Sequence, residues 1–222
     1  MDRPAACLFD LDGLLLDTEP LHSEAWQQAA EQFGLSLQLH QLLALRGRRR
    51  LDCADQVRRW LEAAGLMVPT AEALLAVRQP IAERLLPGAR PLDGAMELIQ
   101  ACLDRGIPMA MVTSSSREAV ALKEAPHPWL ASIVQRIHGD DPELTAGKPA
   151  AEPYLLAAAR LGVEAPSCWA FEDSPAGARS ALAAGCRVHV LLPADLDQAG
   201  ALSQQLPGTI RLLGSLREVR LD

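Results

Sequence analysis

Residues 7–19 read CLFDLDGLLLDTE, and this stretch decides the fold. Its apolar beginning has the composition of a buried strand, which breaks at Gly13 into a turn. Asp10 and Asp12 stand two positions apart at this break. On a buried strand both side chains would face the same side and repel each other, whereas beyond the strand's carboxyl end they can share a cation. We interpret the pair as catalytic, with one carboxylate attacking while the other handles a proton, although two solvated aspartates in a turn are the alternative.

A second apolar run, MAMV, ends in the hydroxyl residues 113–116 and leads into a helix-like stretch. Small hydroxyl side chains and the unpaired backbone N–H groups of a helix start bind anions, so we predict a phosphate site at Thr113 and Ser114. Ser115 and Glu118 have the spacing of a capping box. The alternative is that the serines only cap the helix.

The third segment is a turn, Gly147-Lys148-Pro149, before a helical pattern rich in Ala and Leu at residues 152–161. A lysine held in a turn just before a helix can direct a point charge at phosphoryl oxygens. We therefore take Lys148 as a candidate catalytic residue. An ordinary surface lysine is the alternative.

The fourth segment is the apolar strand 168–171, which ends in Glu172 and Asp173. Pro175 then opens a helix. Paired acids at a strand end suit Mg²⁺, a hard cation that prefers oxygen ligands. Capping of the helix by Ser174 or Asp173 is a second role, compatible with the first.

The order of these patterns predicts the architecture. Strand and helix alternate from residue 93 to residue 192, with strands expected at 108–112, 133–137, 168–171 and 187–192. The alternation predicts an α/β fold, a parallel doubly wound sheet with helices on both faces, whose ligands bind beyond the carboxyl ends of the strands. Residues 20–86 show no strand pattern, because apolar residues recur there at helical spacing: Trp26, Ala29, Ala30, Phe33, Val57, Trp60, Leu61 and Ala64. The polar tail after residue 193 indicates surface helix and strand without an assignable function.

Together the four segments resemble the motifs of the haloacid dehalogenase-like superfamily of phosphohydrolases and phosphomutases, in Asp10-Leu11-Asp12-Gly13, Thr113-Ser114, Lys148 and Glu172-Asp173. The likeness covers nearly the whole chain. It is strongest to the branch that holds β-phosphoglucomutase and small sugar-phosphate phosphatases, in the strings at 14–22, 112–118 and 171–174. The resemblance implies a doubly wound, Rossmann-like core of residues 1–17 and 87–222, with a helical cap domain inserted at 18–86.

The resemblance also implies a mechanism. Asp10 would attack phosphorus and form an aspartyl phosphate, while Asp12 would protonate the leaving oxygen and later activate the acceptor. Thr113, Ser114 and Lys148 would hold the transferring oxygens. Mg²⁺ would be bound by Asp10, the backbone carbonyl of Asp12 and Asp173, with Glu172 either a direct ligand or just outside the ligands.

Two positions in the expected cap are candidates for substrate contacts. The loop 47–52 is far more basic than the mutase loop that it resembles, and within it Arg50 is expected to point inward, while Arg48 and Arg49 are expected on the surface. His22 could assist proton transfer at the sugar in a mutase and would matter less in a plain phosphatase. We favour a phosphatase; a β-phosphoglucomutase-type mutase and a non-catalytic phosphate-binding module are the alternatives.

The segment 148–152, KPAAE, lacks the second proline and the aspartate common in the branch, and we expect this to be tolerated.

Composition narrows the class of protein further. The 21 basic and 28 acidic residues give a formal net charge of −7, which argues against nonspecific nucleic-acid binding. No apolar run suits a bilayer span and no signal peptide is visible, so we expect a cytoplasmic protein without membrane attachment. Five widely spaced cysteines without a Cys-x-x-Cys pair predict buried thiols, not zinc ligands or disulfides. We expect a monomer that acts on a small phosphorylated metabolite.

Overall fold

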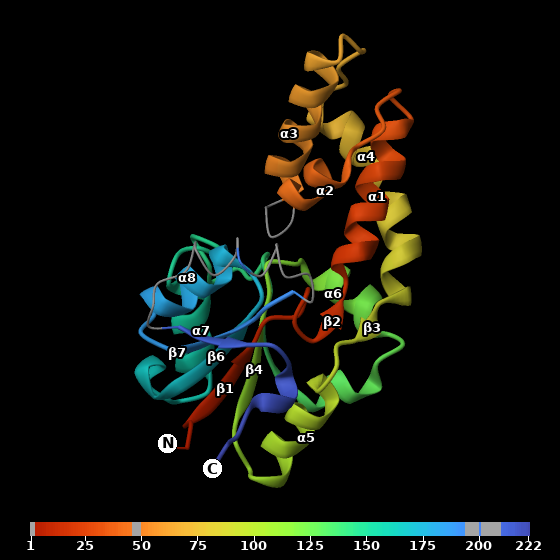
Figure 1. The fold of residues 1–222 in the computed structure, drawn as a ribbon. Coiled ribbons are helices and arrows are strands. Elements are labelled where there is room, and N and C mark those ends of the chain that lie inside the picture. The colour runs from red at the N-terminus through yellow and green to blue at the C-terminus, as the bar shows by residue number, and fades with distance from the viewer. Residues whose placement is uncertain (1–2, 46–49, 194–199, 201–209) are drawn as a thin grey trace. The chain divides into compact units, whose positions relative to one another are not determined.

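A computed structural model describes residues 3–45, 50–193, 200 and 210–222 (Figure 1). The chain divides into two compact units. The first comprises Met1–Asp17 and Arg90–Asp222, and the second comprises Thr18–Ala89. Each unit is described by itself below.

The first unit is built on a six-stranded sheet in which every pair of neighbouring strands is parallel. Its spatial order is β5-β4-β1-β6-β7-β8. The strands are β1 (Ala6–Phe9), β4 (Met109–Val112), β5 (Gln135–Ile137), β6 (Cys168–Glu172), β7 (Arg187–Leu191) and β8 (Arg211–Leu213). The continuous apolar runs of β1, β4 and β6 are buried throughout, as expected for parallel strands covered on both faces.

The strand order places a topological switch point beside β1. From β1 the chain first builds outward through β4 and β5, and then returns to the other side of β1 to add β6, β7 and β8. Phe9 at the end of β1 pairs with Met111 and with Phe171, so the residues that follow these three strands emerge together at one edge. Ligands of doubly wound sheets bind at such a point.

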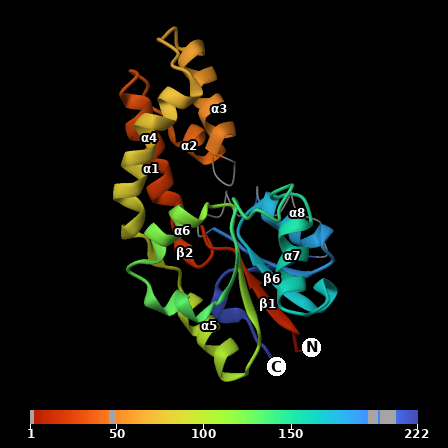
Figure 2. The ribbon, with the colours of Figure 1, turned by 180° about the vertical axis from the view of Figure 1, so that it is seen from behind.

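Helices cover both faces of this sheet. On one face, α7 (Glu152–Arg160) and α8 (Pro175–Ala183) pack on β4, β6 and β7, as Figure 2 shows from behind. The core of this face includes Leu8, Val112, Val188, Tyr154 and Ala178. The other face is reached by α5 (Ala95–Asp104), whose buried Cys102 lies near Cys7 of β1. α6 (Arg117–Glu124) follows β4. The predicted fold class, a doubly wound parallel sheet in an α/β chain with a helical insertion, is confirmed.

Two details of the first unit differ from the sequence prediction. β5 begins at Gln135 instead of Ile133, because Ile133 ends the 3₁₀ helix η2 (Pro128–Ser132) and its N–H donates to the carbonyl of Leu130. The polar tail supplies β8, the sixth strand of the sheet. Its three residues are too few for a recognisable alternation.

The short elements complete the first unit. β2 (Leu16–Asp17) and β3 (Arg90–Pro91) form a two-stranded antiparallel sheet. Two further 3₁₀ helices are η3 (Ala165–Ser167) and η4 (Leu216–Glu218).

The second unit is helical, as predicted. It contains α1 (Glu19–Glu31), α2 (Leu39–Leu45), α3 (Arg50–Ala63), α4 (Ala71–Leu85) and the 3₁₀ helix η1 (Leu86–Gly88). Most of the residues expected at helical spacing lie in or against its core, among them Trp26, Ala29 and Leu61. Ala64 is an exception: it follows the end of α3 and is exposed, because the helix ends one residue earlier.

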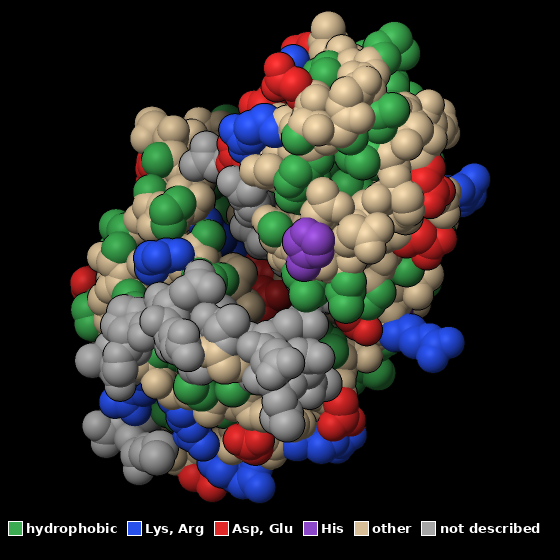
Figure 3. All heavy atoms as spheres, turned by 45° about the horizontal axis from the view of Figure 1, so that its top comes forward, with side chains coloured by type: hydrophobic (Ala, Val, Ile, Leu, Met, Phe, Trp, Pro, Cys, Tyr) green, Lys and Arg blue, Asp and Glu red, His purple; other side chains and the backbone are tan. Residues whose placement is uncertain are grey.

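Three predictions from composition can be compared with the structure. All five cysteines are free and buried, which confirms their interpretation as buried thiols. Within the described ranges, none of the helices combines the length and apolar character that crossing a bilayer requires. On the face drawn in Figure 3, the described Lys and Arg side chains are scattered among acidic and neutral ones.

Candidate active site

The centre of the site is Asp10, directly after β1. Its backbone N–H donates to the carbonyl of Phe171 at 3.0 Å, which continues the β1–β6 ladder by one residue. The carboxyl group is buried, and the Nζ of Lys148 lies 2.6 Å from its Oδ1. The same Nζ lies 2.5 Å from Oε1 of Glu172. Lys148 is therefore a buried bridge between two strand ends and not an ordinary surface lysine.

The electrostatics of this group follow from burial and crowding. Burial raises the pKa of Asp10 to about 7; the nearby ammonium of Lys148 opposes the rise, and the carboxylates of Glu172 and Asp12 add to it. Burial alone would lower the pKa of Lys148, but Asp10 and Glu172 outweigh it and hold that pKa above its usual value. Lys148 is therefore a fixed cation at neutral pH. One ammonium does not balance the carboxylates around it, so the site favours a further cation.

Glu172 is held in place by two groups that sequence reasoning did not identify. The hydroxyl of Tyr154 on α7 donates to its Oε1 at 2.5 Å. Gly177 on α8 leaves room for the carboxylate, since a Cβ at that position would lie 2.0 Å from Oε2. Tyr154 stands in an Ala/Leu-rich helical pattern, where an aromatic residue indicates only core packing.

A cluster of oxygen ligands lies at the same edge. Asp10, Glu172 and Asp173 each offer one carboxylate oxygen, and these oxygens lie within 4.8 Å of one another. Gly13 has φ +83°, and a Cβ there would lie 2.0 Å from Oδ2 of Asp173, so glycine is what permits this approach. An all-oxygen, negatively charged set of this kind fits a hard divalent cation.

The carboxylate of Asp12 has a different set of partners. The Nζ of Lys123 on α6 lies 2.6 Å from Oδ1 and 2.5 Å from Oδ2, and the hydroxyl of Ser115 donates to Oδ2 at 2.8 Å. Lys123 is fully buried. Sequence reasoning missed Lys123, because a lysine in the last turn of a short helix usually lies on the surface.

The hydroxyl segment after β4 differs partly from the prediction. Thr113 is buried and its Oγ1 accepts from the N–H of Ser115 at 3.1 Å, whereas Ser114 is exposed. The predicted capping box of Ser115 and Glu118 is wrong. Ser116 caps α6, with its hydroxyl accepting from the N–H of Ala119 at 3.3 Å, and Ser115 contacts Asp12 instead.

The comparison with known proteins decides the family. The model of the haloacid dehalogenase-like hydrolases matches residues 4–185, most of the chain. The chain belongs to this family. The resemblance predicted from the sequence is therefore confirmed.

Individual relatives of this hydrolase have phosphatase and mutase names. Hexitol phosphatase A of Escherichia coli (strain K12) is 33% identical over 193 residues, which are 85% of this chain and 83% of that protein. Mitochondrial (DL)-glycerol-3-phosphatase 1 of Arabidopsis thaliana is 29% identical over 86% of this chain, which spans 65% of that protein. The crystal structure of a putative β-phosphoglucomutase from Thermotoga maritima matches with a TM-score of 0.74 and 25% identity, over 94% of this chain and 93% of that chain. The chain is thus a phosphatase or phosphomutase.

The loop that carries Lys148 in this hydrolase is anchored by Glu152. Its carboxylate accepts from the backbone N–H groups of Thr145 at 3.0 Å and Ala146 at 2.7 Å. These hydrogen bonds lower the pKa of Glu152. Glu152 thus holds the loop in place in this chain, whose segment 148–152 lacks the aspartate that is common in the β-phosphoglucomutase and sugar-phosphate phosphatase branch.

The two predicted cap residues belong to the second unit and are not among the groups that the first unit brings together. His22 is half-buried, and its Nδ1 lies 2.8 Å from Nη2 of Arg78. Arg50 begins α3, is exposed, and donates through Nη1 to Oε1 of Gln79 at 3.0 Å. The loop positions Arg48 and Arg49 lie outside the described residues.

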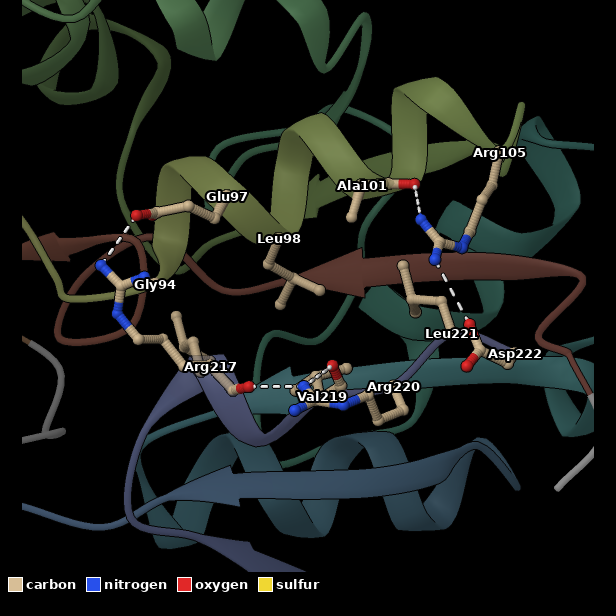
Figure 4. Close-up of a pocket in the computed structure, with 11 residues that line it drawn as sticks. Gly94, Glu97, Leu98, Ala101, Arg105, Arg217, Val219, Arg220, Leu221 and Asp222 are labelled. Carbon is tan, nitrogen blue, oxygen red and sulfur yellow. Dashed lines mark hydrogen bonds and ion pairs between the residues drawn. The ribbon is translucent and has the colours of Figure 1, made fainter.

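A separate hollow of about 300 Å³ lies between α5 and the C-terminal segment of the hydrolase (Figure 4). Its charged side chains already have partners within the protein: Arg217 binds Asp93 at 2.9 Å and Glu97 at 2.7 Å, Arg105 binds Asp222 at 3.3 Å, and Arg220 donates to the backbone carbonyl of Arg217 at 2.7 Å. None of the catalytic candidates lines this hollow, so we place no chemistry there.

Proposed function

We propose that the chain is a Mg²⁺-dependent phosphomonoester hydrolase that acts on a small phosphorylated metabolite, such as a sugar phosphate, through an aspartyl phosphate on Asp10. The observation that carries this proposal is the buried contact of Asp10 with Lys148 at the switch point, beside the oxygen cluster with Glu172 and Asp173. The names of the phosphatase relatives support the substrate class.

In this proposal Asp10 attacks phosphorus in line with the leaving oxygen. Lys148 holds one oxygen of Asp10 at 2.6 Å and remains cationic, so it can neutralise charge on the transferring oxygens without reorganising. Thr113 and Ser114, after the neighbouring strand, bind the remaining phosphoryl oxygens. Asp12, protonated at the start, gives its proton to the leaving oxygen, and the carboxylate that remains then takes a proton from the attacking water.

The metal ligands would be Asp10, Asp173 and Glu172, together with the backbone carbonyl of Asp12. Bound there, Mg²⁺ would neutralise negative charge on the carboxylates and on the phosphoryl oxygens. Because a cation favours the ionised form of a carboxyl group, a metal bound there would also favour the deprotonated form of Asp10 that attacks.

For the second unit, we propose that Arg50 and His22 contact the non-reacting part of the substrate. A bidentate arginine suits a second anionic group on such a substrate. We expect Arg50→Ala to raise KM for anionic sugar phosphates more than KM for p-nitrophenyl phosphate. A monomeric state and a cytoplasmic location remain predictions, which sedimentation and cell fractionation would test.

A phosphomutase is the second candidate, favoured by the likeness to the putative β-phosphoglucomutase. A screen of phosphate release from sugar phosphates, nucleotides and flavin mononucleotide, with hexose 1-phosphate isomerisation assayed in parallel, separates the two. Mg²⁺-dependent phosphate release supports the phosphatase. Conversion of hexose 1-phosphate to 6-phosphate with a bisphosphate primer and little free phosphate would establish the mutase, and inert protein that still binds phosphate would indicate a binding module.

The covalent step is tested by Asp10→Asn, with Asp104→Asn, an exposed position at the end of α5, as a matched control. An amide cannot form the acyl phosphate, so turnover should disappear, while the control retains it. More than about one hundredth of the wild-type rate would contradict covalent catalysis, because acid–base terms alone supply about 10² to 10⁴.

A further inference from the structure

Lysine is rare in this chain. Of its 21 basic residues only two are lysines, Lys123 and Lys148, and the other 19 are arginines. Both lysines are buried, and each binds one of the two aspartates of the first motif, Lys148 to Asp10 and Lys123 to Asp12. An ammonium is a compact point charge on a flexible stem, whereas guanidinium is a broad planar fork, so the two are not interchangeable in a confined site. Lys123 is therefore buried against an aspartate of the first motif in the same way as Lys148, the lysine that we assign to catalysis.

The contacts of Lys123 account for its burial. Its Nζ is within hydrogen-bond distance of three oxygens: Oδ1 and Oδ2 of Asp12 at 2.6 and 2.5 Å, and the hydroxyl of Ser115 at 2.8 Å. A buried ammonium is costly unless it is paired and hydrogen-bonded, and here all three of its protons can be used. Lys123 thus matches the Asp12 side of this site in both charge and hydrogen-bonding capacity.

Ser115 contacts both Lys123 and Asp12. Its hydroxyl accepts from Lys123 and donates to Oδ2 of Asp12, so three side chains form a closed triangle. Ser116, the next residue, caps α6, which leaves the Ser115 side chain to this contact. Both oxygens of Asp12 are thereby held from α6 and from the segment after β4, although Asp12 itself lies in the turn after β1.

From this geometry we propose that Lys123, assisted by Ser115, is a positioning residue that orients the Asp12 side chain so that its carboxyl group can give its proton to the leaving oxygen. The inference rests on the role proposed above for Asp12. A proton-transfer group works only within hydrogen-bond reach of its target, and a misplacement of about 1 Å can cost about 10²-fold in rate. The competing explanation is that Lys123 only fastens α6 to the rest of the unit.

The two explanations differ in their dependence on the leaving group. A nitrophenolate leaves almost without a proton, whereas a sugar alkoxide needs one. Lys123→Met keeps the length of the side chain and removes the charge. We expect it to lower kcat about 10²-fold on a sugar phosphate and less than about 5-fold on p-nitrophenyl phosphate, with little change in KM. Glu118→Met, at an exposed position of the same helix, is the matched control and should leave both rates unchanged.

A double-mutant cycle with Asp12→Asn adds a second readout. If Lys123 acts through Asp12, the variant that carries both Asp12→Asn and Lys123→Met should be no slower on the sugar phosphate than Asp12→Asn alone. Two results would overturn the proposal in favour of a structural role. One is that Lys123→Met lowers kcat equally on both substrates. The other is that the loss of kcat in the double variant equals the losses of the two single variants combined. Should Lys123→Met not fold, Ser115→Ala tests the same geometry. It should show the same leaving-group dependence with a smaller, about 2- to 10-fold loss, and an equal loss on both substrates would again overturn the proposal.

The proposed function and the positioning role of Lys123 are tested by different variants. Full activity of Asp10→Asn would refute covalent hydrolysis whatever Lys123→Met does. Inactive Asp10→Asn together with a Lys123→Met enzyme that keeps wild-type rates on both substrates would refute only the positioning role.

Discussion

Replacing Gly177 with alanine is a sharp test of how the site is packed. Gly177 lies in α8 with ordinary helical backbone, so alanine by itself should favour the helix by about 1 kcal/mol. However, the new Cβ would stand 2.0 Å from Cδ and Oε2 of Glu172 and 2.1 Å from Oε1. An ordinary contact begins at 3.4 Å, so the carboxylate or α8 must move by about 1.4 Å.

The expected loss of stability follows from what the carboxylate would leave. Glu172 accepts hydrogen bonds from Lys148 and from Tyr154, both at 2.5 Å, and it has no exposed surface. Hydrogen bonds to charged groups contribute about 1.5–3 kcal/mol each, so loss of both costs about 3–6 kcal/mol. After subtraction of the helix gain, we expect Gly177→Ala to lower the free energy of unfolding by about 2–5 kcal/mol. For a chain of this length that corresponds to a Tm lower by about 4–20 °C.

Thermal and urea unfolding followed by circular dichroism would measure this change. Gly88→Ala is the matched control, because Gly88 is exposed and a Cβ there meets nothing within 4 Å. The control should stay within about 0.5 kcal/mol of the wild type. If Gly177→Ala is as stable as the wild type or more stable, helix propensity dominates and the packing argument for Glu172 is wrong.

Three further outcomes are expected. Lys148→Ala should lower kcat by about 10² to 10³ through loss of a preorganised cation, and an unchanged kcat in a folded variant would contradict its role. Asp173→Ala should weaken Mg²⁺ binding about tenfold or more without unfolding the protein, as calorimetry would show; unchanged affinity would place the metal elsewhere. Burial, with a contribution from Arg211, lowers the pKa of His189 to about 4, whereas the unfolded value is about 6.5. The unfolded state then binds more protons between these values, so stability should fall by up to about 3 kcal/mol as pH drops from 6.5 to 4. His189→Gln should reduce this slope, unlike His40→Gln at an exposed position.

The strand-end residues could be located from local sequence alone. Asp10, Thr113 and Glu172 each stand at the end of an apolar run, and the carboxyl ends of parallel strands meet at one edge. The helices of residues 19–85 were predictable for the same reason, since period and composition are properties of neighbouring residues. Errors occurred where tertiary contacts outweighed local pattern: Ser115 has capping-box spacing, but its hydroxyl binds Asp12 instead.

The sequence by itself determined the type of each element and the chemical groups at each strand end, because both depend on residues close together in the chain. Only the tertiary structure decided which aspartate each lysine binds, since Lys148 is 138 residues from Asp10 and Lys123 is 111 residues from Asp12. It also decided that Tyr154 and Gly177 hold Glu172, for which the sequence carries no local signal. A helical pattern predicts that a side chain is buried, but the group it meets there is set by how the helices dock on the sheet.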